Sequence, residues 1–240
     1  HLTTEKKEQI LNALPEWQRD MRSKGIPLMG SGLVWPISEE EITYDPEKIK
    51  IQPFWPRGCG MDLGKSDHPT ANVWFAWDRD LDILYLYDCI RTQGTISENA
   101  IKIRQKTDPW IPVFWPHDAT QKDPKSSKTY AQLYGDEGLN MWYESFTNPP
   151  MPGQKRGDLG VEAGLDFIWE HMNTGRFKVN KNLTQWFEEF RMYHRKDGKV
   201  VPLKDDLMSA TRYGALSQRN FRTSNMNYST NIVYDNRGIV

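Results

Sequence analysis

Three short apolar runs joined by even shorter polar turns constrain the fold of this chain most strongly. Residues 57–63, 70–77 and 82–89 are rich in β-branched, aromatic and other apolar side chains, and the turns "GKSDHP" and "DRDL" separate them. Such runs predict β-strands. Turns this short join antiparallel neighbours, because a parallel pair needs a long crossover. The sequence therefore predicts an antiparallel meander as the start of a sheet.

Helical and strand patterns alternate through the rest of the chain. Helices are predicted within 95–107, 127–138, 158–173, 182–194 and 205–219, and further strands within 111–116, 139–145 and 176–179. This order indicates an α/β domain with a mixed sheet, an antiparallel meander plus parallel strands, flanked by helices. We expect an extended arm or linker at 1–55, this domain at 56–216, and a flexible tail at 217–240 that loses periodicity and is rich in polar residues.

Charge and cysteine content exclude several classes of protein. A formal net charge of -1 over 240 residues provides no global basic field, so an anionic partner must meet a local patch. Cys59 and Cys89 lie far apart without CxxC spacing, which argues against a zinc site or a disulfide framework and favours a reducing compartment. We expect an unexported protein that does not span a membrane, and the start at His1 suggests a fragment of a longer chain.

The stretch "GMDLGKSDHP" raises the question of a phosphate-binding loop around Gly64-Lys65-Ser66. That motif requires a glycine five positions before Gly64, where this chain has Cys59. It must also open a helix, because the helix N-terminus supplies the anion-binding amides. Here a strand-like run follows instead. The nucleotide interpretation is therefore rejected, and Asp62 becomes the residue of interest.

Aspartates occur where predicted strands end. Asp62 ends the first strand, and Asp118 follows the buried run 111–116. Each by itself is compatible with a turn or helix cap. Two strands that end in Asp are less easily explained that way, because ligands of open α/β sheets gather at strand ends.

The predicted helix at 205–219 adds a third acidic position. It begins with Asp205 and Asp206, and the small residues Ala210 and Gly214 follow Asp206 at helical spacing. These small residues would let the helix lie close to the sheet, with Asp206 at its near end. Simple N-capping of the helix by one of the two is the alternative role. We favour Asp206 as the functional acid, with Asp205 close behind.

Carboxylates without a His/Cys ligand set suit hard cations such as Mg²⁺ or Mn²⁺. Clustered carboxylates repel one another, so a cation is needed to keep them all charged. Two ions about 4 Å apart would suit in-line hydrolysis of a phosphodiester. The predicted catalytic and metal-binding residues are Asp62, Asp118 and Asp206, with Asp205 as a further metal ligand.

The ordered motifs "GMDLG…DHPTA", "FWPHDAT", "VEAGLDFIWEHMNTGRFKV", "WFEEFRMYHRKDGKVV" and "KDDLMSATRYGAL" resemble the nuclease (C-terminal) domain of tailed-bacteriophage terminase large subunits, an RNase H-like fold. The likeness covers roughly residues 10–216. It implies a metal-dependent endonuclease that cuts concatemeric double-stranded DNA during packaging in the host cytoplasm. It also implies three partners: an ATPase motor domain in the same full-length chain, the terminase small subunit and the procapsid portal.

The resemblance places the family's strand-end acids on Asp62 and Asp118, its helix acid on Asp205 or Asp206, and a further acid near the metals on Asp67. Many relatives continue the last motif as Asp-His followed by Asp-Ala, where this chain has Asp206 after Asp205 and Ser209 before Ala210. The choice between the two helix acids therefore stays open.

Basic residues near the acids are candidates for DNA contact, although ordinary solvated side chains are the alternative for each: Lys65, His117, Lys122, Lys125, Lys128, Lys155 and Arg156. Trp17 and Trp35 in the arm are candidates for contact with the motor domain. Two other functions stay open, a related RNase H-like enzyme such as a junction resolvase or RNA-hybrid hydrolase, and a non-catalytic docking module of the packaging machine.

Overall fold

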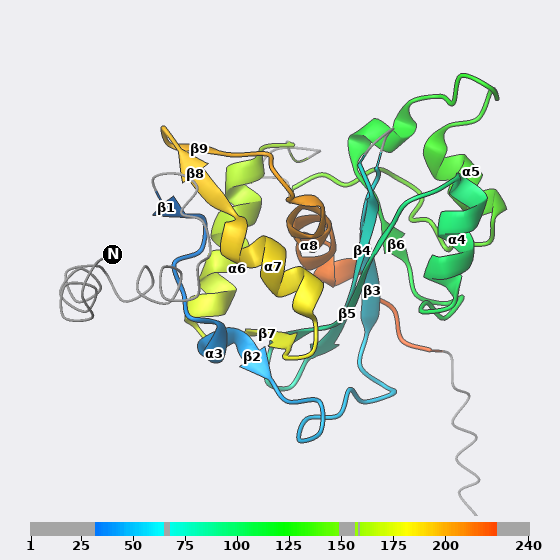
Figure 1. The fold of residues 1–240 in the computed structure, drawn as a ribbon. Coiled ribbons are helices and arrows are strands. Elements are labelled where there is room, and N and C mark those ends of the chain that lie inside the picture. Colours follow the sequence, from blue (N-terminus) through cyan, green and yellow to red (C-terminus); the bar gives the residue numbers. More distant parts are fainter. Residues whose placement is uncertain (1–31, 65–67, 149–156, 158, 225–240) are drawn as a thin grey trace, which may run out of the picture.

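The centre of the molecule is a mixed sheet (Figure 1). The computed structural model describes residues 32–64, 68–148, 157 and 159–224. Its six-stranded sheet has the order β2–β7–β5–β4–β3–β6. The strands are Thr43–Tyr44 (β2), Arg57–Asp62 (β3), Thr70–Asp78 (β4), Ile83–Thr92 (β5), Val113–Phe114 (β6) and Phe177–Asn180 (β7).

Strand directions follow from the lengths of the connections. The short turns join β3, β4 and β5 as an antiparallel meander, whereas β6 runs parallel to β3, and β7 runs parallel to β5 and to β2. The predicted fold class, a mixed sheet of an antiparallel meander plus parallel strands flanked by helices, is confirmed.

Helices cover both faces of the sheet (Figure 1). One face carries α6, α7 and α8, and the other carries α4 and α5. Successive strand residues point to opposite faces, so Phe75 is buried in the first core and Trp74 in the second, each 0% exposed. The helices are Ile96–Arg104 (α4), Tyr130–Asp136 (α5), Val161–Asn173 (α6), Thr184–Met192 (α7) and Asp206–Leu216 (α8).

Helix α8 lies unusually close to the sheet. A Cβ atom on Gly60 of β3 would come within 2.1 Å of the carbonyl oxygen of Ala210, and one on Gly214 would come within 2.5 Å of the Phe75 ring. Only glycines at these crossings allow the helix backbone to contact the strand. The prediction that small residues bring this helix against the sheet is confirmed.

Residues ahead of β3 belong to the same packed unit. Strand β2 lies in the main sheet, and β1 (Gly32–Leu33) pairs with β8 (His194–Lys196), which pairs in turn with β9 (Lys199–Val200). The short helix α3 (Glu39–Ile42) connects β1 to β2. Residues 32–55, which the sequence analysis placed in an arm, therefore supply part of the sheet.

Two expectations for the flanking segments need correction. Trp35 is 2% exposed, and its Nε1 donates a hydrogen bond to the Leu165 carbonyl at 3.1 Å, so it fills the core and is not a surface for a motor domain. Trp17 lies outside the described residues. Beyond residue 216, the turn η2 (Gln218–Asn220) leads to Phe221, which is 2% exposed, so the packed unit extends past the predicted boundary.

The strand predicted within 139–145 does not form in the described structure. Only an isolated parallel bridge joins Met141 to Val113. Strand β6 is two residues long and pairs with β3 on its other side, so it offers too little edge for a further ladder.

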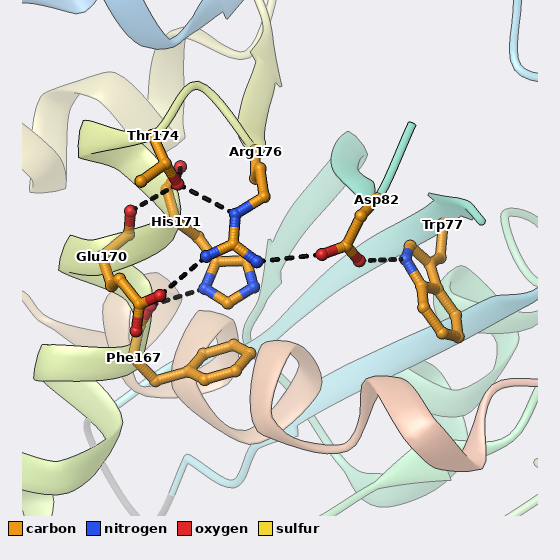
Figure 2. Close-up of polar contacts among 7 residues, drawn as sticks. All are labelled: Trp77, Asp82, Phe167, Glu170, His171, Thr174 and Arg176. Atoms are coloured by element: carbon orange, nitrogen blue, oxygen red, sulfur yellow. Dashed lines mark hydrogen bonds and ion pairs between the residues drawn. The ribbon is translucent and has the colours of Figure 1, made fainter. Parts of the chain in front are cut away.

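A polar cluster fixes the β4–β5 turn to the end of α6 (Figure 2). Arg176 donates to Asp82 Oδ2 at 2.9 Å and to Glu170 at 2.8 Å, while Trp77 Nε1 donates to the other Asp82 oxygen at 3.0 Å. The hydrogen bond from Arg176 lowers the pKa of Asp82. This cluster lies at the edge of the sheet opposite to the end of β3. No helix in the described ranges combines the length and the apolar composition needed to cross a bilayer.

Candidate metal centre

Two of the predicted acids lie at one edge of the sheet. Strands β3 and β6 are parallel neighbours, with Gly60 opposite Phe114, so their carboxyl ends meet at the same edge. Asp62 is the last residue of β3. Asp118 lies in the 3-10 turn η1 (His117–Thr120), which begins soon after β6 ends. The sheet therefore brings together two acids that are far apart in sequence.

The other two acids lie at the start of helix α8. Asp206 is its first residue and Asp205 its N-cap, and the Asp205 side chain makes no capping hydrogen bond with the first turn. Because α8 packs across β3 and β4, its start reaches the edge where Asp62 lies. Both helix acids are partly buried.

The charges of the other acids act on Asp62. Its pKa is raised well above its usual range, first by burial, and then by the negative charges of Asp118, Asp206 and Asp205 in that order. Burial also raises the pKa of both helix acids, and for Asp205 the charge of Asp206 adds to the rise. All four carboxylates thus share one partly desolvated region.

Two basic side chains that were not predicted from the sequence, Arg212 and His68, also act on these acids. Arg212, only 6% exposed, lies over the rings of Tyr213 at 4.7 Å and Phe146 at 5.6 Å, and its charge lowers the pKa of Asp62 and Asp205. His68 acts similarly on both helix acids. The seven-residue spacing from Asp205 to Arg212, which places both on one helix face, is the signal that could have identified the arginine.

A buried acid behind α8 was also missed. Glu189 of α7 is 0% exposed, and burial raises its pKa to about 8, against the opposing effects of hydrogen bonds from the start of α8 and of the charge of Arg91. No sequence signal distinguishes it from Glu188, because the two acids are adjacent in the chain and lie together between Phe187 and Phe190.

The donor chemistry fits a divalent cation, although the carboxylates do not form a finished cage. In the described part of the chain, no group of three or more Asp, Glu, His or Cys side chains is arranged to hold a metal ion. Asp67 lies outside the described residues. The oxygen-only donor set suits Mg²⁺ or Mn²⁺, and a cation would offset the mutual repulsion that raises the pKa of Asp62.

The sequence profile described as "Terminase RNaseH-like domain" matches residues 59–218, which include Asp62, Asp118 and both helix acids. The chain belongs to this family. The RNase H-like fold expected from the motifs is confirmed.

Relatives of this terminase domain include a terminase large subunit from Salmonella phage P22, 36% identical over 231 residues. That match covers 91% of this chain and 42% of the relative, so the chain spans less than half the length of that protein. The solved nuclease domain of the P22 large terminase is 33% identical, with a TM-score of 0.71, over 81% of this chain and 96% of that one. The nuclease of the large terminase from thermophilic phage G20c, solved with bound magnesium, shares the fold at 17% identity and a TM-score of 0.50, over 79% of this chain and 99% of that one.

The basic residues predicted to contact DNA are only partly within the described structure of the terminase domain. Lys122, Lys125 and Lys128 are exposed on a loop next to η1, which a backbone hydrogen bond from Tyr130 to Gln121 closes at 3.1 Å. Lys128 forms an ion pair with Asp136 at 2.7 Å. His117 is exposed in η1 itself, and Lys65, Lys155 and Arg156 lie outside the described residues.

Proposed function

We propose that this terminase domain is a divalent-metal-dependent endodeoxyribonuclease that cuts double-stranded DNA. The single observation that carries the proposal is that the ends of β3 and β6 and the start of α8 bring Asp62, Asp118, Asp205 and Asp206 to one partly buried region at the sheet edge. A protein that used these acids only as caps would have no reason to collect their charges where burial makes them unfavourable.

In the proposed site, Asp62, Asp118 and Asp206 hold the cations, with Asp205 at its rim. Asp67 stays a candidate ligand from the sequence. Four carboxylates carry twice the charge of one divalent cation, which favours two ions over one. When bound, such ions activate a water and stabilise the leaving oxygen of a phosphodiester.

The rest of the site suits a polyanionic substrate. Arg212 supplies a fixed buried charge beside Asp62, which reduces the repulsion between the acids and the backbone of DNA. The exposed lysines at 122, 125 and 128 follow η1 on the surface, and their exposure supports them as candidates to contact phosphates. Such contacts position the backbone without reading its sequence, and they weaken as salt rises.

The biological setting proposed for this activity is viral DNA packaging. It is supported by the likeness to a terminase large subunit, of which this chain covers 42%. We propose that the domain works beside an ATPase motor in its full-length chain, with a terminase small subunit and the procapsid portal, and cuts concatemeric DNA in the host cytoplasm.

Plasmid cleavage by the purified chain tests the activity. With Mn²⁺ or Mg²⁺ we expect nicking or linearisation, with none in EDTA. Asp118→Ala should lower the rate by at least about 100-fold, because a lost ligand removes stabilisation made only in the transition state. Asp80→Ala is the matched control, since Asp80 is an exposed acid in the β4–β5 turn at the opposite edge of the sheet.

Competition between substrates separates the alternatives. A four-way junction or an RNA–DNA hybrid that is cut in preference to plasmid would assign the site to a resolvase or an RNA-hybrid hydrolase. Unchanged cleavage by Asp118→Ala would overturn the catalytic assignment. A chain that neither binds Mn²⁺ nor cuts DNA would favour a docking module.

A further inference from the structure

The start of α8 is capped from outside the helix. Helix N-termini leave amides without intrahelical partners, and a Ser, Thr, Asp or Asn at the N-cap usually accepts from them. Asp205 occupies that position here, but its side chain makes no capping hydrogen bond. Instead, the amide of Leu207 donates to Glu189 Oε2 of α7 at 2.7 Å. Neither Asp205 nor Asp206 is therefore used to cap the helix.

Glu189 is itself held in place from a third element. Its other carboxylate oxygen, Oε1, accepts from Arg91 Nη1 of β5 at 3.0 Å, and the Glu189 side chain is 0% exposed. A buried carboxylate is tolerated when its charge is paired and both of its oxygens accept hydrogen bonds. One side chain thus ties β5, α7 and the first turn of α8 together.

This arrangement costs electrostatic energy that a neutral cap would not. The negative charge of Asp206 disfavours a charge on Glu189. A serine at position 205 would satisfy the same amide without that repulsion. The buried acid is therefore better explained by where it fixes the helix than by how much it stabilises the fold.

We propose that Glu189, held by Arg91, is a positioning residue that fixes the first turn of α8 and so places the carboxylate of Asp206 at the metal centre. This inference rests on the proposed function, because it assigns Asp206 to the cations. Outer residues that orient a metal ligand typically contribute 10–100-fold to metal affinity.

The neighbouring residue on α7 provides a matched control. Glu188 also approaches Arg91, at 3.6 Å from its Nη2, but its side chain is 58% exposed and it has no hydrogen bond to α8 among the described contacts. Glu188→Gln therefore removes a carboxylate next to the same arginine without touching the cap. Ile103→Ala, in the core on the other face of the sheet, controls for loss of stability alone.

The test uses the whole 240-residue chain and two readouts. Hydrogen exchange in the metal-free chain measures protection of the Leu207 amide, and calorimetric titration with Mn²⁺ measures metal affinity. In Glu189→Met, which removes both acceptors, we expect the Leu207 amide to lose protection and Mn²⁺ affinity to fall at least about 10-fold. Glu188→Gln and Ile103→Ala should stay within about 2-fold of wild type in affinity.

Removing one partner of a buried pair is strongly destabilising, so Glu189→Gln provides a milder second variant. It keeps an oxygen that can accept from Leu207, and we expect an affinity between those of wild type and Glu189→Met. Wild-type affinity in both Glu189 variants, or a fall of the same size in Ile103→Ala, would overturn the inference while leaving the proposed function intact. A wild-type chain that binds no Mn²⁺ would overturn the proposed function, and this inference with it.

Discussion

Replacing Asp62 by Asn should stabilise the metal-free chain at the expense of its function. The folded-state pKa of Asp62 is raised, so the native state binds its proton more tightly than the unfolded state does. The contribution of such a group to stability is fully present below the unfolded pKa and is lost as pH rises through the folded pKa. Asn mimics the neutral form of Asp62 at every pH. The variant is therefore more stable than wild type only at higher pH, where Asp62 would be charged.

The size of this gain follows from the charges around Asp62. One like charge at about 6 Å contributes about 3 kcal/mol of repulsion at an effective dielectric constant of about 20. Three carboxylates raise the pKa of Asp62, and Arg212 opposes them. Because partial exposure and side-chain rotation reduce the sum, we expect a net gain of about 1–3 kcal/mol at pH 8. For a domain of this size that corresponds to a rise in Tm of about 2–12 °C.

Thermal and urea unfolding in EDTA at pH 4 and pH 8 measure this effect. Asp62→Asn should be more stable than wild type at pH 8 and nearly as stable as wild type at pH 4. Asp80→Asn should have wild-type stability at both pH values. Adding Mn²⁺ at pH 8 should stabilise wild type, because a ligand that binds only the native state shifts the equilibrium. Mn²⁺ should stabilise Asp62→Asn much less. A variant that is less stable than wild type at pH 8, or that gains as much from Mn²⁺, would refute the reasoning.

Three further predictions concern packing, the distal polar cluster and DNA contact. Gly60→Ala should cost about 1–3 kcal/mol in urea unfolding, because its Cβ would clash with the Ala210 carbonyl; equal stability would contradict the close crossing of α8. Arg176→Gln should cost at most about 1 kcal/mol at pH 7, since the pair is partly exposed. The loss of stability caused by Arg176→Gln should vanish as pH falls through the lowered pKa of Asp82. A loss that is undiminished at pH 2 would show that Arg176 acts through packing and not through its charge. Replacing Lys122, Lys125 and Lys128 together by Ala should lower the affinity for DNA of any sequence. It should also reduce the slope of log affinity against log salt concentration by about 2–3, whereas an unchanged slope would place the DNA contacts elsewhere.

Much of the sheet could be predicted from the sequence because its signals are local. The meander of β3, β4 and β5 follows from apolar runs and short turns, and the close crossing of α8 follows from small residues at helical spacing. Trp35 and β2 could not be placed in this way. Glycine and proline around them indicate an irregular arm, and only contacts with residues more than a hundred positions away draw them into the core and the sheet.

Some residues of the candidate site could likewise be predicted from the sequence, and others could not. The sequence by itself determined which acids end strands or open a helix, since those positions depend on neighbouring residues. The spacing from Asp205 places Arg212 on the same helix face, but only the tertiary structure decided that Arg212 is buried beside Asp62 and that Glu189, not Asp205, caps α8. The physical reason is that a buried charge is set by the partners that surround it in space. Those partners come from β3, β5, α7 and α8, which no window of sequence contains together.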